Sequence, residues 1–78
     1  MSDMYNTHGV ISVTNSNDSE IRLTLEPWAE EVVLSPGQSV QVAFSGPQGG
    51  HMEVDLRPGA VILYGWEGSV FSVKGSER

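Results

Sequence analysis

The sequence offers few side chains that could hold a metal, and cysteine is absent. Disulfide bonds, zinc–thiolate sites and cysteine nucleophiles are therefore excluded. The imidazoles are those of His8 and His51, and His51 stands two residues before Glu53, so both would share one face of a strand. Such a pair supplies half of a weak site, because a stable ion site needs several convergent ligands. We expect a solvated histidine here, with no metal and no cofactor.

No arrangement of residues typical of covalent or acid–base catalysis stands out. The Gly-x-Ser match at 37–39 continues into Val40 and a strand, so it lacks the second glycine of a nucleophile elbow. The glycine-rich segment 45–50 connects two expected strands, whereas a phosphate loop must lead into a helix. Paired carboxylates for glycoside hydrolysis need a groove, which the spacing of the acids does not indicate. The sequence predicts no catalytic residues and a protein that is not an enzyme.

Aromatic residues next to acids are the candidates for partner recognition. Trp28 lies in a turn after Pro27, and Tyr64 and Trp66 flank a glycine where a strand ends. Such side chains either close the ends of a small sandwich or barrel or form a binding hot spot. The neighbouring carboxylates are Glu26, Glu30, Glu31 and Glu67. As a patch, these residues would favour a partner protein with a basic surface.

Acidic residues dominate the charge, with ten Asp and Glu against four Lys and Arg and a net charge of −6. This balance argues against direct binding of nucleic acid or of an anionic membrane. Residues two apart on a strand project to one side with a spacing of about 6.6 Å. The acids that this spacing pairs are Glu53 with Asp55 and Asp18 with Glu20, and Glu26, Glu30 and Glu31 extend the row. The acidic face is either a ligand for a basic protein, a mimic of nucleic acid, or a surface that only confers solubility.

The elements that must position these residues are strands, because apolar and polar residues alternate between regularly placed Gly and Pro. The expected strands are Gly9–Thr14, Glu20–Glu26, Glu30–Leu34, Gln38–Phe44, His51–Leu56, Ala60–Tyr64 and Ser69–Lys74. About seven short strands at this spacing predict an all-β domain, either a small antiparallel sandwich or a partly open barrel. The expected core comprises Ile21, Leu23, Leu25, Val32, Leu34, Val40, Val42, Phe44, Val54, Leu56, either Ile62 or Leu63, and Val70, Phe71 and Val73.

A pattern E-V-x-L-x-P-G occurs at 31–37 and again 22 residues later at 53–59. The two copies suggest two equivalent strand–turn–strand units, one in each sheet. In the first copy, Leu34 and Val40 must share a face, which requires an odd-length connection. The unit is therefore either a bulged hairpin or an arch between sheets.

The motifs L-E-P-W-A-E at 25–30, L-S-P-G at 34–37 and G-W-E-G-S at 65–69 resemble a group of short, uncharacterised bacterial β-rich proteins. The resemblance covers roughly residues 21 to 73 and implies a compact β fold without an assigned activity. In size and charge the chain is also similar to phage-encoded inhibitors, anti-CRISPR proteins included, that imitate nucleic acid. The Pro-Gly turns resemble those of cupins, but the histidine-rich metal motif of cupins is absent, so a cupin-like ligand-binding or enzymatic function is the weaker alternative.

At 78 residues the chain is expected to be one domain, with a flexible segment 1–8 and a frayed end 75–78. Residues 1–8 lack the basic and apolar regions of a signal peptide, and no apolar run could span a bilayer. These features predict a cytoplasmic, soluble protein whose function is carried by protein–protein contacts.

Overall fold

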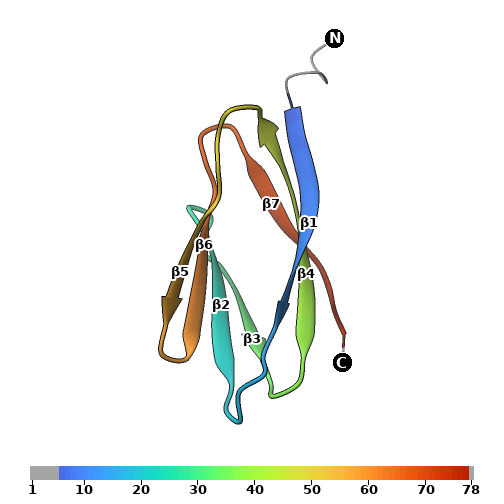
Figure 1. Ribbon diagram of the computed structural model, residues 1–78, viewed down its shortest axis with the longest axis vertical. Coiled ribbons are helices and arrows are strands. Elements are labelled where there is room, and N and C mark those ends of the chain that lie inside the picture. Colours follow the sequence, from blue (N-terminus) through green and yellow to red (C-terminus); the bar gives the residue numbers. More distant parts are fainter. Residues whose placement is uncertain (1–5, 78) are drawn as a thin grey trace.

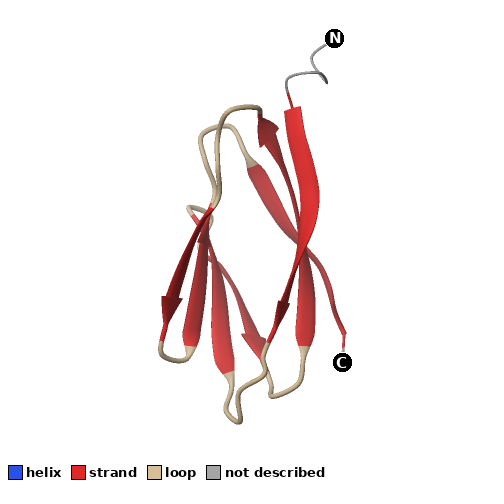
Figure 2. Cartoon of the chain, in the orientation of Figure 1, coloured by secondary structure: helices blue, strands red, loops and turns tan. Residues whose placement is uncertain are grey.

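The computed structural model describes residues 6–77, in which seven strands and no helix are found (Figures 1 and 2). The strands are β1 (Asn6–Thr14), β2 (Ile21–Glu26), β3 (Glu30–Leu34), β4 (Ser39–Pro47), β5 (Glu53–Arg57), β6 (Ala60–Tyr64) and β7 (Val70–Glu77). The prediction of an all-β fold is confirmed. In this part of the chain there is no helix long and apolar enough to cross a membrane.

The strands form two separate sheets, so the fold is a sandwich and not a barrel. One sheet has the order β1-β4-β7 and the other the order β3-β2-β6-β5. The two layers face each other along the length of the molecule (Figure 1). Strand β1 includes residues 6–8 of the expected flexible segment, and β7 runs into the expected frayed end; residues 1–5 and 78 lie outside the described range.

The centre of the four-stranded sheet departs from the expected antiparallel pattern. Strands β2 and β6 are parallel, with Arg22 opposite Ala60 and Glu26 opposite Tyr64. The cause is the path of the chain, which leaves this sheet after β3, forms β4 in the other sheet, and returns through β5 at the edge. The β5–β6 hairpin then places β6 beside β2 in the same direction.

The two copies of the repeated pattern form different connections, so the prediction of equivalent units in separate sheets is wrong. After β3 the chain crosses to β4 in the other sheet, which is the arch alternative. After β5 it turns through Pro58 and Gly59 into a tight hairpin, in which Arg57 pairs with Ala60. Gly59 has a φ of +72°, a conformation that costs glycine little. Strands β3 and β5 are the two opposite edges of the same sheet.

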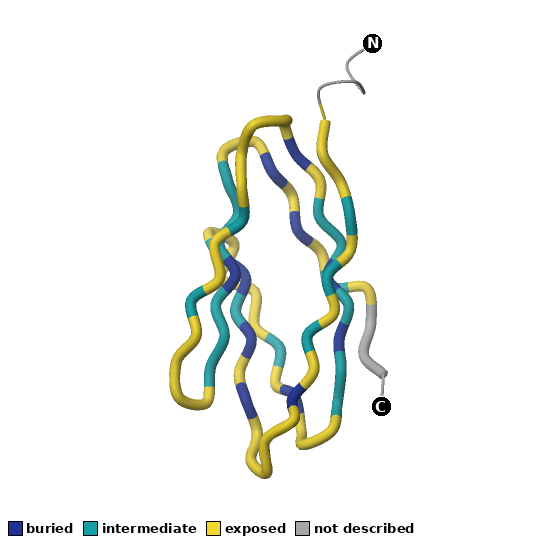
Figure 3. The backbone as a smooth tube through the Cα atoms, in the orientation of Figure 1, coloured by how far each residue is buried: buried dark blue, intermediate teal, exposed yellow. Residues whose placement is uncertain are grey.

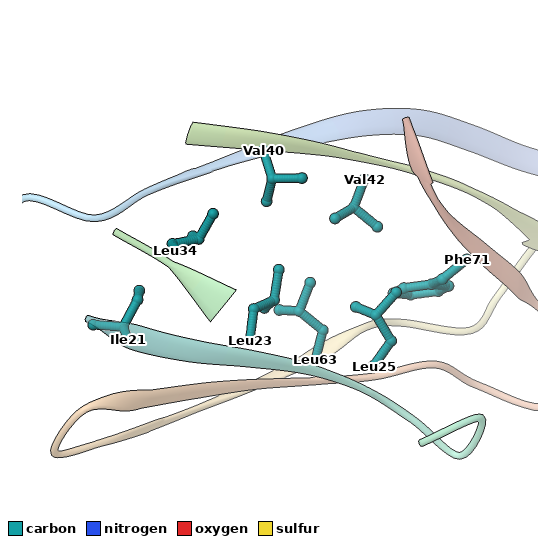
Figure 4. Close-up of a cluster of buried hydrophobic side chains, with 8 residues drawn as sticks. All are labelled: Ile21, Leu23, Leu25, Leu34, Val40, Val42, Leu63 and Phe71. Atoms are coloured by element: carbon teal, nitrogen blue, oxygen red, sulfur yellow. The ribbon is translucent and has the colours of Figure 1, made fainter. Parts of the chain in front are cut away.

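The core consists of the inward-facing apolar side chains of both sheets (Figure 4). Among the described residues the buried members are Ile21, Leu23, Leu25, Leu34, Val40, Val42, Leu63 and Phe71. Of the alternatives Ile62 and Leu63, it is Leu63 that faces inward. Val32, Phe44 and Val73 are partly buried and pack against this cluster. Along the strands, buried or half-buried positions alternate with exposed ones (Figure 3).

Three expected core residues are instead exposed: Val54 by 49%, Leu56 by 75% and Val70 by 60%. Val54 pairs with Leu63 and Leu56 with Val61, so both project from the inner face of the sheet. They are uncovered because β5 is the edge of a four-stranded sheet that faces one with three strands. Val70 precedes the buried Phe71 and therefore projects from the outer face.

Asn15, which follows β1 in the polar segment 15–19, is a buried residue with an exposed fraction of 1%. Its Nδ2 donates hydrogen bonds of 2.9 Å to the carbonyl oxygens of Ser19 and Leu34. Its Oδ1 accepts one of 2.9 Å from the backbone N–H of Asn17. Its own backbone bonds to Gln38 and Gly37 in the β3–β4 arch. One side chain thus ties the β1–β2 loop to the end of β3.

Candidate functional site

The outer face of the four-stranded sheet carries the acidic residues that the sequence singled out on β2, β3 and β5. Because paired residues in neighbouring strands lie on the same face, the register defines the rows across the sheet. One row contains Glu31, Thr24, Ile62 and Asp55, and another contains Glu26, Tyr64 and Glu53. The pairing of Glu53 with Asp55 on one face of β5 is therefore confirmed.

Two arginines on this face are engaged in ion pairs within the sheet. Arg57 donates two hydrogen bonds to Oδ2 of Asp55, of 3.1 Å from Nε and 2.9 Å from Nη2. This hydrogen bonding, followed by the carboxylate charge, raises the pKa of Arg57 above its ordinary value. Arg22 Nη1 lies 3.4 Å from Oε2 of Glu31. Both pairs lie at the surface, where solvent screens the charges, and each pair neutralises one carboxylate of the face.

The row Glu26–Tyr64–Glu53 keeps its negative charge. Neither carboxylate forms an ion pair within the described part of the chain. Tyr64 is directly opposite Glu53 on β5 and Glu26 on β2. With strands about 4.8 Å apart, the two acidic residues are separated by about 10 Å across the tyrosine ring. This arrangement can hold a Lys or Arg side chain by charge from both sides and by contact with an aromatic ring.

Three other acids do not extend this row as expected. Glu30 pairs with Leu25, whose side chain is buried, so Glu30 projects from the opposite side of the sheet to Glu31. Asp18 and Glu20 precede β2 and lie in the β1–β2 loop, where the two-residue spacing of a strand does not apply. The interpretation of these residues as one continuous acidic row is corrected accordingly.

The two tryptophans lie together in an aromatic cluster at one end of the sandwich, on the inner side. The Trp28 ring centroid is 5.2 Å from that of Phe71, and that of Trp66 is 6.1 Å from Phe71 and 6.4 Å from Phe44. Tyr64 follows the buried Leu63 and faces outward. The aromatic patch expected from the sequence is therefore divided between two faces of the sheet.

Trp66 is held tightly within this cluster, whereas Trp28 lies at its rim. The indole Nε1 of Trp66 donates a 2.9 Å hydrogen bond to the carbonyl of Pro47. Its ring packs so closely on Gly50 that an added Cβ there would overlap the indole. Trp28 is 39% exposed and covers Gly65. This geometry favours an end-closing role for Trp66 and leaves one edge of Trp28 accessible.

The histidines do not converge with acids. His51 is exposed and lies before β5, which begins at Glu53, so the expected strand face shared by these two residues does not form. His8 is exposed on β1, in the other sheet. Within residues 6–77 there is no group of three or more His, Cys, Asp or Glu side chains placed to hold a metal ion.

Sequence reasoning did not find the row Glu26–Tyr64–Glu53, because the row depends on the parallel register of β2 and β6. The only signal was the position of each residue at the end of its strand.

Comparisons with protein-family models, with curated proteins and with solved structures give no match for this chain.

Proposed function

We propose that the protein is a non-enzymatic binding module that recognises a basic surface of another protein through the outer face of its four-stranded sheet. The observation that carries this proposal is the row Glu26–Tyr64–Glu53, in which two carboxylates without an ion pair flank the half-buried Tyr64. Complementary charge of this kind accelerates encounter and selects partners. A tyrosine between the carboxylates adds rigid contact area in the middle of this row.

The distribution of charge between the two sheets supports the same function. The outer face of the β1-β4-β7 sheet carries the side chains of His8, Val10, Ser12, Gln41, Ala43, Ser45, Val70 and Ser72, none of which is acidic. Apart from Glu77, the last residue of β7, the acids of the strands belong to the four-stranded sheet. Solubility alone does not require the charges to be separated in this way. A docking face benefits from the separation, because charges of one sign on one surface attract a partner of opposite charge.

The ion pairs favour a basic protein partner over mimicry of nucleic acid. Mimicry requires an unbroken series of negative charges at phosphate-like spacing. Arg57 neutralises Asp55 next to Glu53, and Arg22 neutralises Glu31. The remaining charges form one short row across three strands, which fits one or two basic side chains better than a nucleic-acid groove.

The test compares charge reversal on the face with the same reversal elsewhere. The double variant Glu26→Lys/Glu53→Lys changes the net charge as much as Asp18→Lys/Glu67→Lys, whose residues lie in loops. Each form is used as bait in a native extract, and proteins retained by the wild type and the loop variant but lost by the face variant are identified. Association of the purified partner with the wild type should then slow steeply with salt as the screening length falls below about 8 Å.

Equal retention by both variants would refute the proposal. Competition by DNA for the same partner would instead support the mimic. Charge reversal on an exposed face should leave the unfolding transition unchanged, and a urea titration of each bait checks this control.

A further inference from the structure

The free edge of β1 is an unprotected strand edge. Strand β1 has nine residues, pairs with β4 without a register shift, and contains no proline and no Asp, Glu, Lys or Arg. The other edge strands carry charges: Glu31 on β3, Glu53 and Arg57 on β5, and Lys74 on β7. Charges, prolines and bulges are the usual means of preventing a further strand from pairing with an edge. Strand β1 has none of them.

The hydrogen-bonding groups on this edge can be assigned from the ladder. The backbone N–H of Asn15 bonds to the carbonyl of Gln38, at the end of the β1–β4 pair. Because successive residues of a strand point their N–H and C=O groups to alternate sides, residues 13, 11 and 9 also face β4. The N–H and C=O groups of His8, Val10 and Ser12 therefore face the open side, without a strand partner.

The inner face of β5 provides an apolar surface beside this edge. Val54 and Leu56 project inward but are 49% and 75% exposed, because the facing sheet has one strand fewer. A hollow of about 260 Å³ lies between the end of β1 and the β5–β6 hairpin, and Thr14, Leu56 and Val61 line it. On this side, the three-stranded sheet is one strand narrower than the four-stranded sheet that it faces.

We propose that a single extended segment of a partner protein adds to β1 as a fourth strand of its sheet. Its backbone pairs with the open N–H and C=O groups of Val10 and its neighbours. Its alternate side chains, β-branched or apolar, cover Val54 and Leu56. Lys or Arg at its ends suits a chain with a net charge of −6. This surface is separate from the acidic face, so the proposal stands independently of the proposed function.

The uncovered β5 strand also argues for a peptide segment and against a second folded copy. Two copies that paired β1 with β1 about a two-fold axis would place both four-stranded sheets on the same side of the joined sheet. Leu56 of β5 is uncovered beside the end of β1, so such pairing would bring the two β5 strands against each other. A single added strand brings no second sheet with it, so it would not collide with β5.

The probe is a library of nine-residue synthetic peptides with Val, Ile, Leu or Thr at alternate positions and Lys at both ends. Binding is measured by fluorescence anisotropy of labelled peptides. Val10→Pro removes an open N–H without removing a bond to β4, and proline is tolerated on this side of an edge strand. We expect library members to bind the wild type saturably, and Val10→Pro to weaken their binding by about tenfold or more.

A second pair of variants tests the apolar surface without altering β1. Leu56→Lys should weaken binding by a similar factor, whereas Val33→Lys, at a side chain 46% exposed on β3, should leave it unchanged. Urea titrations confirm that each variant is folded. Absence of saturable binding by any peptide, or equal binding to wild type and Val10→Pro, would overturn the proposal. Self-association of the wild type that Val10→Pro abolishes would also overturn it, in favour of a second copy.

Discussion

Asn15 provides the sharpest test of how this small sandwich is held together. Its side chain makes three hydrogen bonds of 2.9 Å at a site that is 1% exposed. Asn15→Ala removes all three, and at about 1 kcal/mol for each bond the loss is about 3 kcal/mol. A domain of this size has a total stability of order 5 kcal/mol. We therefore expect Asn15→Ala to lose more than half of its free energy of unfolding.

Asn15→Asp separates hydrogen bonding from packing, because the two side chains have the same shape. A carboxylate there would face the carbonyl oxygens of Ser19 and Leu34, and burial away from water would add to the repulsion. Both effects raise the pKa of the introduced carboxyl in the folded state. A raised folded pKa gives stability that is present at low pH and lost as pH rises through that pKa. The variant should therefore be more stable near pH 4 than at pH 7, relative to the wild type.

The measurement is urea unfolding followed by tryptophan fluorescence at both pH values. The matched control is Asn17→Ala, because Asn17 is exposed and its contact with Asn15 uses only its backbone N–H. This control should change the free energy of unfolding by less than about 0.5 kcal/mol. A loss below about 1 kcal/mol for Asn15→Ala, or similar losses for both alanine variants, would refute the argument that this side chain joins the loop to β3.

Four further substitutions test the core, the aromatic cluster and the turn before β3. Leu23→Ala, at a fully buried side chain, should lower the free energy of unfolding by about 2 to 5 kcal/mol. Leu56→Ala should change it by less than about 0.5 kcal/mol. Equal losses of stability for these two variants, measured by urea unfolding, would contradict the uncovered position of β5. Gly50→Ala places a Cβ within the Trp66 indole, so tryptophan emission should move to longer wavelength, and an unchanged spectrum would argue against this packing. Ala29→Gly relieves a φ of 61° and should raise the free energy of unfolding by up to about 1 kcal/mol; a decrease measured in urea would show that the turn is not strained.

Local alternation predicted the strands and much of the core, because side-chain direction within a strand depends only on the neighbouring residues. Leu23 and Leu56 have the same alternating pattern, yet one is buried and the other 75% exposed. The difference depends on the number of strands in the facing sheet, which no local pattern encodes. The same limit applies to the candidate site: the i, i+2 spacing on β5 was predictable, but the row through Tyr64 required the β2–β6 register. Asn15 was missed because the polar cluster around it is typical of an exposed turn.

The parallel pairing of β2 with β6 has a consequence for the order of events during synthesis. Arg22 of β2 pairs with Ala60 of β6, so the central strands of this sheet cannot pair until a further 38 residues have been synthesised. At a translation rate of about 5 to 20 residues per second, this delay lasts about 2 to 8 s. During that time the apolar side of β2 has only β3 beside it in the sheet and no Leu63 to pack against. The nascent chain therefore leaves the inward-facing side chains of Ile21, Leu23 and Leu25 without their partner from β6 until the ribosome has delivered that strand.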